Sequence, residues 1–69
     1  MKEIAIKLNN HFNEKRMFFI DGNTVRSFFW KVEVGSNSFF VHSTNTHDSG
    51  ILGEAQTIEE IIALIEADN

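Results

Sequence analysis

Apolar and polar residues alternate along most of the first 43 positions, which is the pattern of half-buried β-strands. The alternation is longest over residues 24–34, where Trp30 and Val32 share one face. Asp21-Gly22-Asn23 and Gly35-Ser36 interrupt it, and Gly and Asn tolerate the positive φ angles of tight hairpin turns. The pattern therefore predicts four antiparallel strands. These are residues 2–8, 15–20, 24–34 and 37–43, with Ile51-Leu52 as a short candidate fifth strand.

The C-terminal segment changes to a helical period. Thr57-Ile-Glu-Glu60 matches a capping box, in which the threonine hydroxyl accepts from the Glu60 amide and the glutamate side chain reaches back. Isoleucines recur at helical spacing and form one apolar stripe, namely Ile58, Ile61, Ile62 and Ile65. We predict a helix over residues 57–67. The fold class is α+β: a single domain over residues 1–69, in which an antiparallel meander carries one C-terminal helix packed on one face.

Three Phe-Phe pairs, at residues 18–19, 28–29 and 39–40, fall in three successive predicted strands. Neighbouring residues on a strand point to opposite faces, so each pair puts one ring on each side of the sheet. A single short helix can cover only one of these faces. We therefore predict an uncovered outer face with aromatic and apolar side chains edged by basic ones. Its residues are Phe18, Ile20, Val25, Phe29 and Phe40, with Arg16, Lys31 and His42 at the edge.

Three interpretations of these aromatic residues remain open. The sheet could curl into a small barrel and hide both sets of rings. The outer face could be a protein interface, since aromatic residues rimmed by Lys and Arg are typical of interface centres and monomers seldom expose so large an apolar patch. It could also bind single-stranded nucleic acid, with bases stacked on Phe and phosphates held by Lys and Arg.

Composition excludes several classes of site and favours association with a partner. The chain has 69 residues, no cysteine and no proline, and it is 42% hydrophobic and 23% charged, as globular domains are. Without cysteine there are no disulfides, thiol nucleophiles or cysteine zinc sites. A chain this short buries only about 60% of its surface on folding, so association with a partner is a common route to stability. No apolar run is long enough to cross a membrane and no signal-peptide pattern is present, so we expect a cytoplasmic protein.

Charge is distributed unevenly. All six Lys and Arg lie in residues 1–31, against three acids, whereas residues 32–69 hold seven acids and no Lys or Arg. The net charge of −4 argues against nucleic acid, because phosphate attraction supplies much of such affinity. The acidic C-terminal segment is a second candidate contact surface, made of Glu54, Glu59, Glu60 and Glu66.

Catalytic and metal-binding patterns are weak. His42, His47 and Asp48 are the candidate metal ligands together with His11, but their spacing fits no known metal motif, so we predict neither a metal nor a cofactor. The adjacent residues His47-Asp48-Ser49 cannot converge as a catalytic triad, and no glycine-rich phosphate loop occurs.

The sequence thus predicts a small non-catalytic protein-binding or regulatory module. We expect a homodimer through the outer face or a contact with another protein, of the kind made by a phage-type inhibitor or regulator. The alternative is a sheet that binds single-stranded nucleic acid.

Overall fold

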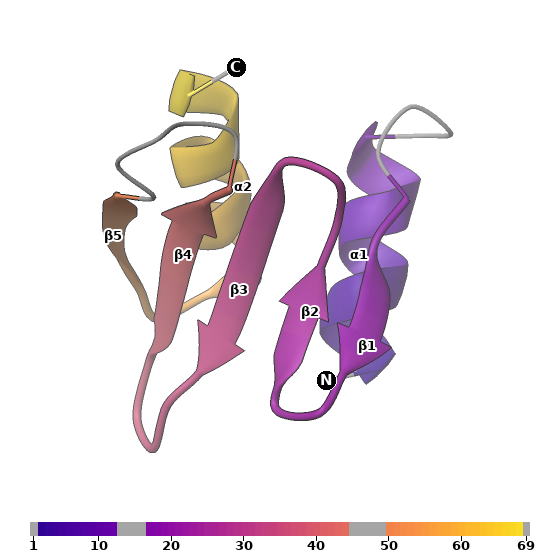
Figure 1. Cartoon of the computed structure of the whole chain (residues 1–69), viewed down its shortest axis with the longest axis horizontal. Helices are drawn as coiled ribbons and strands as arrows, with labels where there is room; N and C mark the ends of the chain where they lie inside the picture. The colour runs from indigo at the N-terminus through magenta and orange to yellow at the C-terminus, as the bar shows by residue number, and fades with distance from the viewer. Residues whose placement is uncertain (1, 13–16, 45–49, 69) are drawn as a thin grey trace.

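The computed structural model describes residues 2–12, 17–44 and 50–68. It contains one sheet of five antiparallel strands in the order β1-β2-β3-β4-β5, and a helix at each end of the chain (Figure 1). This confirms the predicted α+β meander and adds an N-terminal helix to it. The elements are α1 (Lys2–Phe12), β1 (Phe19–Asp21), β2 (Thr24–Arg26), β3 (Trp30–Val34), β4 (Phe39–Ser43), β5 (Ile51–Ala55) and α2 (Ile58–Asp68).

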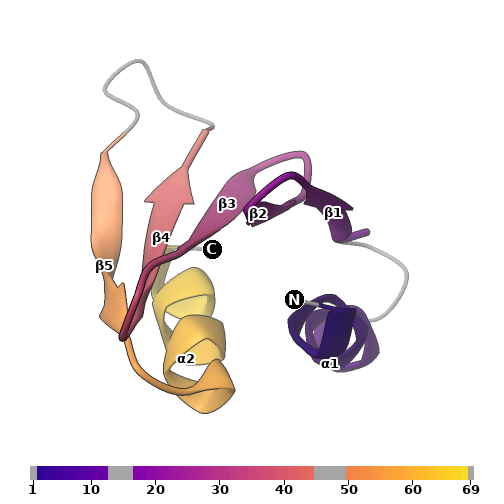
Figure 2. The ribbon, with the colours of Figure 1, turned by 90° about the horizontal axis from the view of Figure 1, so that it is seen from below.

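Both helices lie on the same side of a curved sheet, as Figure 2 shows. α1 packs beneath β1, and α2 packs beneath β4 and β5. The strands β1 and β5 form the two edges of the sheet and do not pair with each other, so the sheet does not close into a barrel. No element of the described chain covers the opposite face. We call the helix-covered side the inner face and the other side the outer face.

The predicted strand over residues 2–8 is wrong, because this segment belongs to helix α1. Ile4, Leu8 and Phe12 are buried at intervals of four residues, and Ile6, which an alternating strand would bury with them, is 51% exposed. A short apolar segment can satisfy a period of two and a helical period at once. Burial against the sheet selects the helix, because it brings Phe12 onto the same buried side as Leu8.

The predicted strand over residues 24–34 is wrong too, because it is a hairpin. β2 and β3 run antiparallel with Val25 opposite Val32, and Phe28 and Phe29 form the two-residue loop between them. The Ser27 N–H closes this loop by donating to the Trp30 carbonyl at 2.8 Å. The chain reversal brings Val25 onto the same face as Val32, which a single continuous strand would not do.

The other two hairpins agree better with the sequence. The turn predicted at Asp21-Gly22-Asn23 is present: Ile20 lies opposite Val25 across Gly22–Asn23, and Gly22 has the positive φ of 64° that this turn favours. The next loop consists of residues 36–37, one position beyond the predicted turn. The resulting register differs by two residues, so Val32 faces Val41 and each side chain keeps its predicted face. Of the predicted strand over residues 15–20, the structure shows β1 beginning at Phe19, and residues 15 and 16 lie outside the described part.

The core is formed between the inner face and the two helices. Val25, Val32 and Val41 come from three adjacent strands and are fully buried. Ile61 and Ile65 of α2 are fully buried as well, as the predicted isoleucine stripe requires. The threonine cap is also confirmed, and the glutamate side chain reaches back one residue further than a capping box requires. Thr57 Oγ1 accepts from the Glu60 N–H at 3.2 Å, and Glu60 Oε1 accepts from the Gln56 N–H at 2.6 Å.

Two acidic residues near the end of α2 connect this helix to other elements. Negative charge is unfavourable at a helix C-terminus. Asp68, however, accepts a hydrogen bond from Trp30 Nε1 on β3 at 2.9 Å. Glu66 lies 2.9 Å from His11 Nε2 on α1. These contacts link α2 to the sheet and to α1.

Candidate protein-interaction surface

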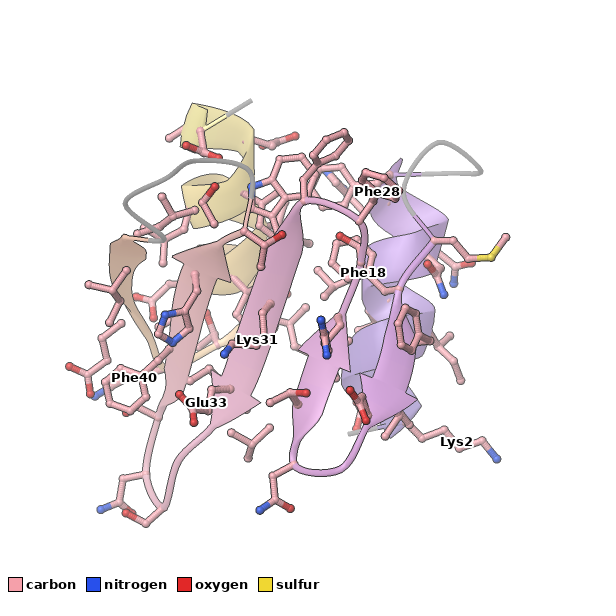
Figure 3. All side chains as sticks on the ribbon, viewed as in Figure 1. Lys2, Phe18, Phe28, Lys31, Glu33 and Phe40 are labelled. Carbon is pink, nitrogen blue, oxygen red and sulfur yellow. The ribbon has the colours of Figure 1, made fainter. Side chains whose placement is uncertain are left out.

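The outer face carries two parallel rows of side chains that cross the strands. Alternation along β3 places Lys31 and Glu33 on the side opposite the buried Val32, and Figure 3 shows both projecting from the uncovered side of the sheet. The strand register continues each row to its neighbours. The basic row consists of Arg26, Lys31 and His42, and the acidic row consists of Asp21, Glu33 and Glu54, with Thr24 and Phe40 between these acids.

The two rows are connected by one ion pair and by one histidine–glutamate contact, which is an ion pair only when the imidazole is protonated. Arg26 Nη1 lies 2.9 Å from Asp21 Oδ2, and His42 Nε2 lies 3.3 Å from Glu33 Oε1. Lys31 is half-buried between Arg26 and His42 and has no ion-pair partner among the described residues. The middle of the outer face therefore presents, beside the acidic row, a cation that no described residue pairs.

Phe40 contributes an apolar area to this face. It lies on the β5 side of the outer face, in the acidic row (Figure 3). Its ring is half-buried against Gly35, where an added Cβ would come within 3.1 Å of the Phe40 ring atom Cε2. The absence of a side chain at Gly35 thus lets the ring lie flat on the sheet. Phe19 and Ile51, more than half exposed, lie at the two ends of the basic row.

The structure brings together only some of the residues predicted for the outer face. Lys31, Phe40 and His42 lie on it as expected. The prediction for Phe18 and Val25 is wrong, because Phe18 is only 3% exposed and Val25 is fully buried, both in the core. The reversal at residues 28–29 moved Val25 to the inner face, and Phe18 precedes β1 with its ring against Phe12 of α1. The outer face is therefore more charged and less aromatic than predicted.

The remaining predicted residues lie elsewhere. Ile20 is opposite the buried Val25 in the register, so it belongs to the inner side of edge strand β1, where it remains partly exposed. Phe29 is in the β2–β3 loop, and Arg16 lies outside the described residues. Of the acidic surface, Glu54 lies in the acidic row on β5. Glu59, Glu60 and Glu66 are exposed on α2 and do not extend that row, although Glu60 and Glu54 meet at the β5 edge of the sheet.

Sequence reasoning missed the most exposed aromatic residue. Phe28 is 88% exposed at the end of the β2–β3 hairpin, where it makes an edge contact with the Phe29 ring (Figure 3). Thr44, which directly follows strand β4, holds the loop: its N–H donates to the Phe29 carbonyl at 2.8 Å and its hydroxyl to the Phe28 carbonyl at 3.1 Å. Nothing in the sequence signals this turn, because two-residue loops favour Asn and Gly rather than Phe.

The described residues show little sign of other kinds of site. Within residues 2–12, 17–44 and 50–68, no three His, Asp or Glu side chains are grouped so that they could hold a metal ion. His47 and Asp48 lie outside these ranges. The helices of the described chain are too short and too polar to cross a membrane.

Comparisons with protein-family models, curated proteins and solved structures find no match to this chain. Its function therefore has to be inferred from the geometry of its surfaces.

Proposed function

We propose that this protein is a non-catalytic interaction module that forms a homodimer through its outer sheet face. One observation carries the proposal: rows of opposite charge lie side by side on a face that neither helix covers. A surface that presents both signs in parallel rows is complementary to a second copy of itself. Dimerisation would also supplement the small core of a 69-residue chain.

The charges select one orientation of the two copies. Residues two positions apart on a strand are about 7 Å apart, so the rows are close neighbours. Consider a two-fold axis that lies parallel to the outer face, perpendicular to the strands and between the two rows. This axis places the basic row of one copy over the acidic row of the other. Lys31 then lies opposite Glu33 of the second copy. An axis along the strands would stack like charges, which costs several kcal/mol at an interface.

Apolar contacts would add to this pairing. In the same orientation Phe40 covers His42 of the second copy, and the exposed Phe19 and Ile51 at the row ends lose contact with water. Aromatic and apolar side chains of this kind carry most of the binding energy in interfaces, whereas rim charges set orientation and specificity. The proposal therefore assigns affinity to Phe40 and its neighbours and orientation to the two rows.

Reversing the central charges tests the proposal by light scattering or sedimentation at about 100 µM, a concentration at which micromolar affinity is visible. Wild type should be a dimer. Lys31→Glu and Glu33→Lys should each be monomeric, because each variant presents one sign to itself. A mixture of the two should form a heterodimer. Lys7→Glu makes the same charge change as Lys31→Glu, but at an exposed position of α1, and this variant should remain a dimer. A monomeric wild type, or a mixture that stays monomeric, would refute the proposal.

A regulator or inhibitor of the kind that phages encode fits such a module, since it acts by contact and needs no active site. We also propose a cytoplasmic location, which suits a chain without cysteine.

Single-stranded nucleic acid is a second candidate ligand, favoured by the exposed Phe28-Phe29 loop directly beyond the Arg26–Lys31 pair of the basic row. Bases could stack on these rings while phosphates meet the basic row. The acidic row about 7 Å away opposes this function, as does the net charge of −4. Binding of a labelled oligonucleotide that weakens steeply with salt and with Lys31→Ala would support it. Binding without salt dependence would contradict it.

A further inference from the structure

The edge strand β5 offers unpaired main-chain groups. The Gly35 N–H donates to the Ser38 carbonyl at 2.8 Å, which sets the alternation of hydrogen-bonded pairs between β3 and β4. By that alternation Phe39 directs its main-chain groups towards β5 and pairs there with Ala55. The next residue along, Glu54, then points its N–H and carbonyl away from the sheet. Exposed groups of this kind are templates for an added strand.

An open hollow of about 290 Å³ lies beside this edge, between β5 and α2. It is lined by Glu54, Glu60, Ala63 and Leu64. Gly53 leaves room for the Leu64 side chain here, because a Cβ at this position would lie 2.8 Å from Leu64 Cδ2. An edge strand with a hollow between it and a neighbouring helix is an arrangement that can hold an extended peptide and one of its side chains.

The charge of the hollow indicates which peptide it fits. Glu54 accepts a hydrogen bond from Ser38 Oγ at 2.6 Å, and Glu60 accepts one from the Gln56 N–H. Each carboxylate keeps further acceptor sites, and neither has an ion-pair partner among the described residues. Residues 32–69 contain no Lys or Arg that could supply one. A cationic side chain is therefore the missing complement.

We propose that the hollow between β5 and α2 binds an extended, basic segment of a partner protein, which adds to β5 as a sixth strand. Main-chain hydrogen bonds to Glu54 would hold the segment. A Lys or Arg side chain would reach Glu54 and Glu60, and an apolar side chain would pack on Leu64. A second copy of this chain fits less well, because two β5 edges paired antiparallel about Glu54 would place like charges side by side.

Glu54 is shared with the acidic row of the homodimer face, whereas Glu60, Ala63 and Leu64 belong to α2 on the other side of the sheet, so Glu60→Gln tests this site independently of the proposed dimer. The probe is a fluorescein-labelled heptapeptide of alternating valine and lysine, with blocked ends, and the readout is fluorescence anisotropy. We expect saturable binding at or below about 1 mM. Glu54→Gln and Glu60→Gln, which keep their hydrogen bonds to Ser38 and Gln56, should each weaken it about fivefold. Glu59→Gln, on α2 but outside the hollow, is the matched control and should bind as wild type does.

Two further peptides separate strand addition from general charge attraction. A peptide that is N-methylated at every residue loses the main-chain donors of both edges and should no longer bind. A peptide with glutamate in place of lysine should not bind either. Lys31→Glu, which breaks the proposed dimer, should leave peptide affinity unchanged. Absence of saturable binding, equal binding of the N-methylated peptide, or an equal loss in Glu59→Gln would each overturn the proposal.

Discussion

Asn9 provides the sharpest test of how the N-terminal helix is attached to the sheet. Its side chain binds both main-chain groups of Phe18: Oδ1 accepts from the Phe18 N–H at 2.6 Å, and Nδ2 donates to the Phe18 carbonyl at 3.0 Å. Phe18 comes just before β1, which is an edge strand and has a neighbouring strand on one edge only. The asparagine side chain thus takes the place of a strand at this position and ties α1 to β1.

Asn9→Ala removes both hydrogen bonds from a partly buried site. Each is worth about 1 kcal/mol of net stability, and an unpaired buried main-chain group costs at least as much. Part of this loss in the free energy of unfolding, roughly 0.5 kcal/mol, is offset because alanine is a better helix former than asparagine. We expect a loss of about 1.5–2 kcal/mol in the free energy of unfolding. A domain of this size has about 3–10 kcal/mol in total, so the variant should melt roughly 6–16 °C lower.

Urea unfolding followed by the fluorescence of Trp30, the only tryptophan, measures this loss. Protein concentration must be the same for all variants, because dimerisation shifts apparent stability. Asn10→Ala is the matched control: it removes the neighbouring, exposed asparagine of the same helix and should change stability little. Asn9→Asp keeps the acceptor but loses the donor, so it should lie between the two. Equal stability of Asn9→Ala and Asn10→Ala would refute this account of how α1 is held.

Three other substitutions have defined outcomes in the same urea assay. Thr57→Ala removes the cap on the Glu60 N–H and should cost about 1 kcal/mol, which Thr57→Ser should largely restore. Asp68→Ala leaves Trp30 Nε1 without this acceptor and should cost about 1–2 kcal/mol; a loss no larger than that of an exposed helix site would contradict the role of this bond. Phe28→Ser changes a ring that is mostly in water, so unfolding should shift by less than about 0.5 kcal/mol, and a loss above this would show that the ring packs.

The charged outer face shows how far the candidate site follows from sequence. The pairing of Lys31 with His42 depends on a hairpin register, yet an error of two residues leaves both on the same face, because side chains alternate with a period of two. Faces are therefore robust to small errors in turn position. The opposite-charge rows were not predictable, since they require knowing which residues of five strands lie opposite one another.

The sequence by itself determined the elements whose signals are local. Helix α2 follows from its cap and its isoleucine stripe, and the hairpin at Gly22-Asn23 follows from turn chemistry. Each of these signals is contained within about ten neighbouring residues. Periodicity and capping act over the same range, which explains why they can be recognised without the rest of the molecule.

Tertiary structure decided the N-terminal element and the split of β2 from β3. The segment at Ile4 and Leu8 fits both a strand and a helix, and burial against the sheet, together with the Asn9 bonds to Phe18, selects the helix. The reversal at Phe28-Phe29 runs against turn preferences. It is held by Thr44, which lies far along the chain, and by burial of Val25 against Val32. Such long-range contacts outweigh local propensity because their burial energies exceed the small differences between backbone preferences.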